Sequence, residues 1–316
     1  MAFWDNLRVV VTGGGGFLGT HIASRLKESG ALQDQISVPR SKDLDLRIWE
    51  NCVKAVEGSD VVIHAAGNVG GIGSNAAHPA TFFYDNAAIG INLIEAARRA
   101  RVKKMVLLGT VCSYPKFAKI PFREEDLWDG YPEETNAPYG LAKKMLLVQS
   151  QAYRQEYNFN SINLLPVNLY GPGDNFDVVS SHVIPALIRK FEDAITSDRE
   201  YIEVWGTGRA SREFIYVDDA AEGIVLATER YNKPEPVNIG SGKEITIKSL
   251  ATLLAELMEF TGSIKWDSSK PDGQPRRKLD TSRADKEFGF KARTDFVEGL
   301  RRTVDWYIEQ RSRGNL

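Results

Sequence analysis

The sequence is poor in the residues that hold disulfide-rich or metal-dependent proteins together. It contains two cysteines, Cys52 and Cys112, and four histidines without the spacing of metal ligands. Neither a disulfide framework nor a zinc site is indicated, and we expect no bound metal. Cys52 is expected to pack in the core, whereas Cys112 directly follows a predicted strand and is a candidate for chemistry.

An excess of charge of one sign and long apolar runs are also missing. The 40 Lys and Arg residues nearly balance 42 Asp and Glu residues, which gives a net charge of -2. Such a balance excludes a strongly basic surface, so we expect neither nucleic acid nor an anionic membrane as a partner. No window is apolar enough to span a bilayer, and residues 1–8 do not resemble a secretory signal. We therefore expect a cytoplasmic protein.

What the sequence does contain is an alternation of short apolar strands and helical patterns over 316 residues. This alternation predicts an α/β fold, a Rossmann-type doubly wound parallel sheet followed by a smaller C-terminal substrate domain. We expect residues 1–166 to form the dinucleotide-binding domain, with a returning segment at about 211–241. Residues 167–210 and 242–316 are expected to form the substrate domain.

A glycine-rich turn lies between the first strand and the first helix. Gly13, Gly16 and Gly19 follow a β-branched run, and Phe17 and Leu18 open a helical pattern. Glycines allow the backbone to turn tightly and to approach a pyrophosphate, which the helix N-terminus attracts. Because the motif stands between a strand and a helix, a dinucleotide site is favoured over a simple turn.

The second predicted strand, residues 35–38, should carry the group that reads the adenosine ribose. An NAD-binding protein usually has an acidic residue there, but this chain has Pro39, Arg40, Ser41 and Lys42. A basic turn with a hydroxyl group suits a 2′-phosphate, so we predict NADP(H), with NAD(H) as the open alternative. Asp45 and Leu46 follow and are expected near the adenine, and the small residues Ala65 and Ala66 after the third strand let the dinucleotide lie against the sheet.

Tyr139 and Lys143 stand four residues apart at the start of a predicted helix, so they share one face about a turn apart. We expect the ammonium to favour the phenolate form of the tyrosine and to hold a ribose hydroxyl. The pair gains weight from Thr110, which lies at the carboxyl end of the fourth strand, where the ligand crevice of such a sheet opens.

Taken together, these motifs resemble the extended short-chain dehydrogenase/reductase superfamily, and within it the GDP-L-fucose synthase family. Further stretches carry the resemblance across most of the chain beyond residue 65. They include Asn68-Val69-Gly70-Gly71-Ile72, Cys112-Ser113-Tyr114-Pro115-Lys116, residues 168–176, residues 181–187, Val204-Trp205-Gly206-Thr207-Gly208, Arg212-Glu213-Phe214 and Lys270-Pro271-Asp272-Gly273.

The resemblance implies an NADPH-dependent enzyme that inverts C3 and C5 of GDP-4-keto-6-deoxy-D-mannose and then reduces C4. Thr110, Tyr139 and Lys143 match the catalytic triad of the superfamily, and Cys112 and His182 match the pair that moves protons at carbon. The chemistry agrees, because thiols and imidazoles titrate near neutrality in suitable surroundings and hydrogens flanking a ketone are acidic.

The resemblance also implies contacts to the ligands and an assembly. The cofactor set includes Pro166, Asn168, Leu169 and His182, and the substrate set consists of Asn168, Val183, Lys190, Trp205, Arg212 and Asp272. A homodimer through the helices near residues 80–100 and 137–157 is implied. Gly15 stands where some members carry an arginine for the 2′-phosphate, so Arg40, Ser41 and Lys42 would take over that contact.

Three alternatives remain at this point. A related epimerase or reductase could act on another 4-keto hexose or on a heptose, since the pocket for the sugar depends on tertiary shape. A 4,6-dehydratase is disfavoured, because those enzymes carry Asp-Glu where this chain has Val111-Cys112. A non-catalytic NADP(H) sensor belongs to a different class and would not need an intact Tyr139 and Lys143.

Overall fold

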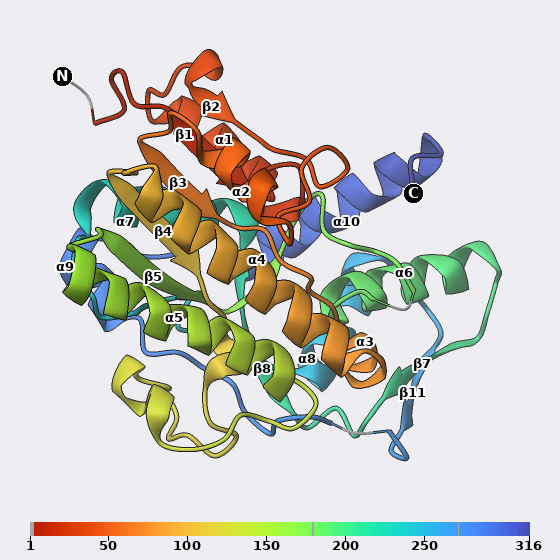
Figure 1. Cartoon of the computed structure of the whole chain (residues 1–316). Helices are drawn as coiled ribbons and strands as arrows, with labels where there is room; N and C mark the ends of the chain where they lie inside the picture. The colour runs from red at the N-terminus through yellow and green to blue at the C-terminus, as the bar shows by residue number, and fades with distance from the viewer. Residues whose placement is uncertain (1–2, 179, 271) are drawn as a thin grey trace.

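The computed structural model describes residues 3–178, 180–270 and 272–316 (Figure 1). Its largest sheet contains β1 (Val9–Thr12), β2 (Ile36–Ser37), β3 (Val61–His64), β4 (Lys104–Leu108), β5 (Ser161–Pro166) and β9 (Val237–Ile239). The strands run in the order β2-β1-β3-β4-β5-β9, and every pair is parallel. The strand order reverses beside β1, and ligands bind at such a reversal, outside the carboxyl ends of the strands.

Helices cover both faces of this sheet. One face packs against α1 (Phe17–Glu28) and α7 (Val217–Arg230), and the other against α2 (Trp49–Val56), α4 (Pro79–Arg99) and α5 (Ala137–Tyr157) (Figure 1). The period-2 alternation of strand side chains explains the two layers: Val9 and Val11 belong to the first core, and Val10 belongs to the second. The short α3 (Ile72–Ala77) precedes α4, and α9 (Ser282–Phe288) packs beside α7 and β9.

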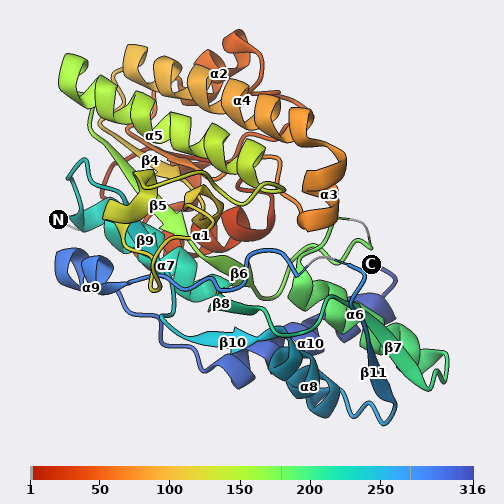
Figure 2. The same ribbon diagram turned by 90° about the horizontal axis from the view of Figure 1, so that it is seen from below.

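A smaller unit lies below the carboxyl ends of the large sheet (Figure 2). It contains a three-stranded sheet of β6 (Asn168–Tyr170), β8 (Ser211–Tyr216) and β10 (Glu244–Thr246), and a parallel pair of β7 (Tyr201–Trp205) and β11 (Ser263–Asp267). Helices α6 (Val183–Thr196), α8 (Ile247–Leu257) and α10 (Phe296–Ser312) share an apolar core with these strands. Within the segment 211–241, β8 pairs in this smaller sheet, whereas α7 and β9 join the large unit.

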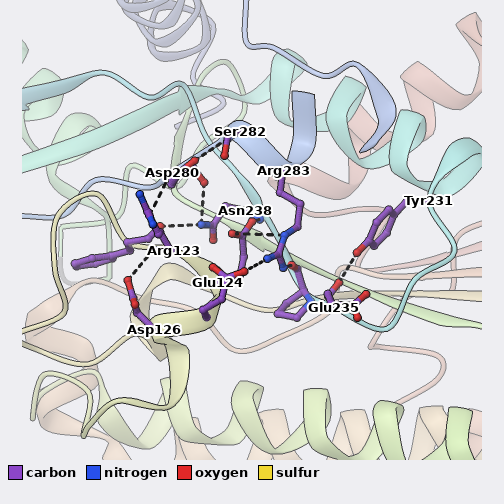
Figure 3. Close-up of polar contacts among 12 residues, drawn as sticks. Arg123, Glu124, Asp126, Tyr231, Glu235, Asn238, Asp280, Ser282 and Arg283 are labelled. Carbon is purple, nitrogen blue, oxygen red and sulfur yellow. Dashed lines mark hydrogen bonds and ion pairs between the residues drawn. The ribbon is translucent and has the colours of Figure 1, made fainter. Parts of the chain in front are cut away.

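The segment from 272 to 283 runs between the two units and is anchored along its length. Backbone N–H groups of Ser211 and Glu213 donate to the carbonyl groups of Pro275 and Arg277. Figure 3 shows the far end of the segment, where the Asn238 side-chain amide donates to the Asp280 carbonyl at 3.0 Å. The Arg283 side chain there donates to the carbonyl of Pro236 at 2.8 Å. These bonds fix the path of the chain past the cleft described below.

Three short 3₁₀ helices complete the fold: η1 (Gln33–Gln35), η2 (Val111–Ser113) and η3 (Glu124–Trp128). The doubly wound parallel sheet and the smaller second unit confirm the predicted fold class. Three short elements, α2, α9 and β11, are additional to the sequence prediction. Among the described residues, no helix combines the length and apolarity that a membrane span requires.

Candidate functional site

All the predicted site residues line one cleft between the two units, with a volume of about 1180 Å³. This volume exceeds that of a pocket for one small ligand, so the cleft can hold a dinucleotide and a second nucleotide together. On the cofactor side the lining residues are Gly13, Gly16, Phe17, Leu18, Gly19, Arg40, Ser41, Asp45, Leu46, Ala65, Ala66, Pro166, Asn168 and Leu169. On the reaction and substrate side they are Thr110, Cys112, Tyr139, Lys143, His182, Val183, Lys190, Trp205, Arg212 and Asp272.

The glycine turn brings the N-terminus of α1 to the floor of the cleft. Gly13 has φ of 72°, and a Cβ at this position would lie 2.7 Å from the backbone nitrogen of Ala66, at the end of the adjacent β3. Only glycine meets both demands without strain. The helix then begins at Phe17 with free N–H groups facing the cleft, which is a site for a pyrophosphate.

The basic turn after β2 closes one end of the cleft. Arg40 is exposed, and its guanidinium lies over Gly15, where a Cβ would collide with it. Arg40 therefore occupies the space of the side chain that position 15 lacks. Nearby, the Asp45 carboxylate accepts from Arg47 Nη2 at 2.7 Å, which with a second bond from Arg47 lowers the pKa of Asp45. Asp45 thus holds Arg47 in place at the cleft wall.

The helix α5 and the 3₁₀ turn η2 bring Tyr139, Thr110 and Cys112 together. A Cβ at Gly140 would collide with the carbonyl oxygen of Cys112, so glycine permits this close approach. The Ser113 hydroxyl donates to the Gly140 carbonyl at 2.9 Å and ties the two elements. The Thr110 hydroxyl accepts from the Cys112 backbone N–H at 3.1 Å and shares a side-chain hydrogen bond with Tyr139.

The electrostatics of the tyrosine and the lysine differ from the sequence prediction. Burial raises the pKa of Tyr139, a negative charge on Cys112 raises it further, and the hydrogen bond from Thr110 only partly opposes these effects. Lys143 is buried as well, and burial lowers its pKa to about 8. The expectation that Lys143 lowers the pKa of Tyr139 was therefore wrong, because loss of solvation dominates both groups.

Cys112 and His182 face the cleft from the two different units. Cys112 is partly exposed on η2, and His182 is open to the cleft at the N-cap of α6. Protein encloses the imidazole on its other sides, which lowers the pKa of His182, and the positive charge of Arg277 lowers it further. The Arg277 guanidinium lies 3.5 Å from Cys112 Sγ. A thiol and an imidazole thus lie around the same guanidinium.

The far end of the cleft offers an aromatic face and a buried cation. Trp205 is 53% exposed, and the ammonium of Lys270 lies 5.5 Å from its ring centroid. Arg212 is buried and donates to the carbonyl group of Asp272 at 3.0 Å. Burial, and secondly the charge of Arg277, lower the pKa of Arg212 to about 9. The exposed ring of Trp205 and the buried guanidinium of Arg212 line the same cleft. Together they suit a nucleotide, whose base can stack on the ring and whose diphosphate can bind the guanidinium.

Like Arg212, three further predicted substrate contacts have partners within the protein. Lys190 Nζ donates to the carbonyl group of Glu203 at 2.8 Å, and the side-chain amide of Asn168 donates to the carbonyl group of Glu213 at 2.8 Å. The carboxylate of Asp272 accepts from both the backbone and the hydroxyl group of Thr207 at 2.7 Å. Asp272 therefore shapes the loop around Arg212 through its own bonds. Pro271 of the same motif lies outside the described residues.

Sequence reasoning missed several residues of the cleft wall, of which Arg277, Gln274 and Asp174 are buried. Arg277 belongs to a run of basic residues that reads as a solvated loop, so only the path of the chain reveals its position. Burial raises the pKa of Asp174 to about 7, and one of its carboxylate oxygens is buried without a partner.

Over the described ranges, no group of three His, Cys, Asp or Glu residues is arranged to hold a metal ion.

The sequence matches the NAD dependent epimerase/dehydratase family over residues 9–240. It is 41% identical to a probable GDP-L-fucose synthase 1 of Oryza sativa subsp. japonica over 303 residues, which cover 96% of this chain and 92% of the relative. A GDP-L-fucose synthetase from Naegleria fowleri bound to NADP superposes with a TM-score of 0.86 at 28% identity, over 98% of this chain and 96% of that one. A GDP-6-OMe-4-keto-L-xylo-heptose reductase from C. jejuni gives 0.88 at 28% identity, over 96% and 98%.

Proposed function

Because the chain belongs to the NAD dependent epimerase/dehydratase family, and within it to the GDP-L-fucose synthases, we infer that it makes GDP-L-fucose. It is an NADP(H)-dependent 3,5-epimerase and 4-reductase of GDP-4-keto-6-deoxy-D-mannose. The observation that carries this conclusion is the joint presence, in one cleft, of a Tyr and Lys pair and of a separate thiol and imidazole. A simple 4-epimerase would not need the second pair.

The cofactor site agrees with NADP(H). We propose that the N-terminus of α1 holds the pyrophosphate and that Arg40, with Ser41 and Lys42, holds the 2′-phosphate. Lys143 would hold the nicotinamide ribose. When bound, the cofactor supplies the hydride that reduces C4. The role of the protein at that step is to orient the ketone, to exclude water and to provide a proton.

The epimerisation is assigned to groups that act from the two sides of the cleft. One of Cys112 and His182 removes the proton from a carbon flanking the ketone, and the other returns a proton to the opposite face. Thr110 and Tyr139 lie together and donate hydrogen bonds to the ketone oxygen, where negative charge develops in the enolate. After both inversions Tyr139 gives its proton to the C4 oxygen during reduction. The raised pKa of Tyr139 keeps this proton in place until it is needed.

The nucleotide end of the substrate is assigned to the far side of the cleft. Trp205 offers its exposed face to the guanine. Arg212, whose Nη1 and Nη2 atoms each donate one hydrogen bond to a backbone carbonyl group, offers its remaining N–H groups to the diphosphate. We assign four further residues of the same cleft to the substrate, namely Val183, Lys190, Asn168 and Asp272. A heptose substrate is a second candidate, since the heptose reductase shares the fold, but the 41% identity to a fucose synthase favours the 6-deoxyhexose.

The test is to supply GDP-4-keto-6-deoxy-D-mannose and NADPH, to follow NADPH oxidation, and to identify the product by NMR. We expect GDP-L-fucose, and we expect Tyr139→Phe to lower turnover by about 10²- to 10⁴-fold. The proposal fails if folded, NADPH-binding protein leaves this sugar unreduced. NADPH oxidation only with a keto-heptose would instead support the second candidate, and NADPH binding without turnover of either sugar would support a sensor.

We further propose a homodimer formed through α4 and α5. These helices lie side by side on the outside of the large unit (Figure 1). They expose large apolar side chains, namely Phe83, Tyr84, Ile91 and Val148. Large apolar side chains exposed on neighbouring helices are typical of a protein interface. Sedimentation equilibrium would test the dimer, and Ile91→Glu should shift the population to monomers.

A cytoplasmic location is proposed as well. Both cysteines are free thiols, and Cys112 must stay reduced to transfer protons. A reducing compartment satisfies this requirement. Fractionation of cells that express the chain would test it, and recovery of the protein in an oxidising compartment would contradict it.

A further inference from the structure

The guanidinium of Arg277 contacts the sulfur of Cys112, and the proposed function leaves this arginine without a role. Its Nη1 atom lies 3.5 Å from Cys112 Sγ, within hydrogen-bond distance for sulfur. The arginine is buried, with only 6% of its surface exposed. Within the described part of the chain, no carboxylate lies at ion-pair distance from this guanidinium, so the thiol is its nearest acidic group.

The same turn that carries Cys112 also holds the arginine in position. Arg277 Nε donates to Gln274 Oε1 at 3.1 Å. The buried Gln274 in turn donates through Nε2 to the carbonyl group of Lys116 at 2.9 Å, just beyond η2. The backbone N–H of Glu213 donates to the Arg277 carbonyl at 2.9 Å and fixes the segment from the other side. The guanidinium therefore keeps its orientation toward the sulfur.

The groups that face Cys112 favour a negative charge on its sulfur. Arg277 and Arg212 are cations, and Tyr139 stays neutral because its pKa is raised. Two carboxylates whose charges act on Arg212 are held by hydrogen bonds within the protein. Asp272 accepts from Thr207, and Glu133 accepts from the side-chain amide of Asn136 at 2.6 Å. A cation beside a thiol stabilises the thiolate, which is the reactive form.

We propose that Arg277 is a positioning residue that orients the sulfur of Cys112 and stabilises the negative charge of its thiolate form. This proposal rests on the proposed function. The thiolate takes a proton from a carbon flanking the ketone, and the electron pair of that C–H bond forms the enolate, with its charge on the ketone oxygen. Protonated His182 then delivers its proton to the opposite face of the carbon. The products are a thiol and a neutral imidazole, and solvent carries one proton from the thiol to the imidazole to restore the pair.

The position of Arg277 assists both transfers. It stabilises the charge on the sulfur before proton removal. Burial, and secondly repulsion by Arg277, lower the pKa of His182, so its protonated form is a stronger acid. His182 and Cys112 are thereby given different tasks by one guanidinium. The sequence alone, in which the two residues are merely a pair, leaves these tasks unassigned.

The test measures the rate of alkylation of Cys112 by iodoacetamide as a function of pH, quantified by peptide mass spectrometry. Cys52 serves as the internal reference, since its thiol is buried, donates to the Leu46 carbonyl at 3.0 Å and has its pKa raised to about 12. Removing the charge with Arg277→Met should lower the rate at pH 7.5 about tenfold. At high pH every thiol is ionised, so the alkylation rate there depends only on how easily iodoacetamide reaches Cys112. Dividing by this rate corrects for any change in accessibility that the substitution causes.

Two further variants separate charge from structure. Arg277→Lys keeps the charge and should restore most of the rate at pH 7.5. Arg276→Met is the matched control, because neighbouring Arg276 is exposed and pairs with Glu244 at 2.6 Å, and it should behave like wild type. NADPH binding verifies folding. If Arg277→Met has the midpoint of the wild-type pH profile, the proposal is overturned.

The alkylation experiment needs no sugar, so its outcome is independent of the substrate assignment. A second measurement tests the role of Arg277 in the proposed reaction itself. With GDP-4-keto-6-deoxy-D-mannose in deuterated water, Arg277→Met should slow deuterium incorporation next to the ketone about tenfold. A shifted alkylation profile with no turnover of this sugar would support the role of Arg277 and reject the proposed function. If alkylation of Cys112 is unchanged in Arg277→Met and the wild-type protein forms GDP-L-fucose, the proposed function is supported and the role of Arg277 is rejected.

Discussion

The guanidinium of Arg40 lies over Gly15, in the space that a side chain at position 15 would fill. The basic group that faces the adenosine end of the cleft therefore comes from the turn after β2, and the glycine leaves room for it. We expect Arg40→Ala to raise the KM for NADPH by about 10- to 100-fold, because a charge-assisted pair with the 2′-phosphate is lost. The KM for NADH should change little. Equal effects on both cofactors would contradict this role.

Gly140 sets the distance between α5 and the turn that carries Cys112. In Gly140→Ala the new methyl group would collide with the backbone of Cys112, which cannot move as a side chain can. We expect the free energy of unfolding to fall by about 2 kcal/mol and both epimerisation and reduction to slow. Gly73→Ala in α3 is the control, since its Cβ would make only an ordinary contact with Trp205 at 3.9 Å. Denaturant titration and turnover check both variants.

The lowered pKa of Lys143 predicts how cofactor use depends on pH. With a pKa of about 8, Lys143 is charged below this pH and neutral above it. We expect kcat/KM for NADPH, which reports the free enzyme, to fall as pH rises through about 8. Lys143→Arg keeps the charge at every accessible pH, so its lower activity should not show this decline. A wild-type profile that stays flat from pH 6 to 10 would contradict the assignment.

Trp205 should contribute a stacking surface for guanine. We expect Trp205→Ala to weaken GDP binding about tenfold, since base stacking on an aromatic ring contributes about 1–3 kcal/mol. Trp128 has a similar exposure of 55%, compared with 53% for Trp205, but it belongs to η3 and packs against Lys144. Calorimetry should therefore find wild-type GDP affinity in Trp128→Ala. Equal losses in both variants would show that Trp205 has no specific role.

The fold and the location of the site could be predicted because local patterns encode them. Gly13 to Gly19 between a strand and a helix, and Tyr139 four residues before Lys143, carry their meaning within a few residues. The buried strands read as apolar runs, and β4 ends at Leu108, which places Thr110 just beyond its carboxyl end, as predicted. Such signals depend on local backbone geometry and on the spacing of residues along a helix or strand, and both can be read from neighbouring residues in the sequence.

Other features depend on contacts between distant segments. The pKa of Tyr139 rises because of burial, which no spacing reveals, although its neighbour Lys143 predicts the opposite. Arg277 reaches Cys112 only because Gln274 is held by the chain after η2, 158 residues earlier in the sequence. β8 pairs with β6 and β10, although further elements separate it from both strands in the sequence. Tertiary packing decides each of these cases.

The most direct test of the account is turnover of GDP-4-keto-6-deoxy-D-mannose with NADPH in deuterated water, with the product analysed by NMR. Wild-type protein should give GDP-L-fucose with deuterium at both C3 and C5, because both carbons lose and regain a proton. Cys112→Ser should retain NADPH binding and lose this incorporation. Wild-type rates of exchange at both carbons in Cys112→Ser would contradict the assignment of the isomerising step to Cys112 and His182.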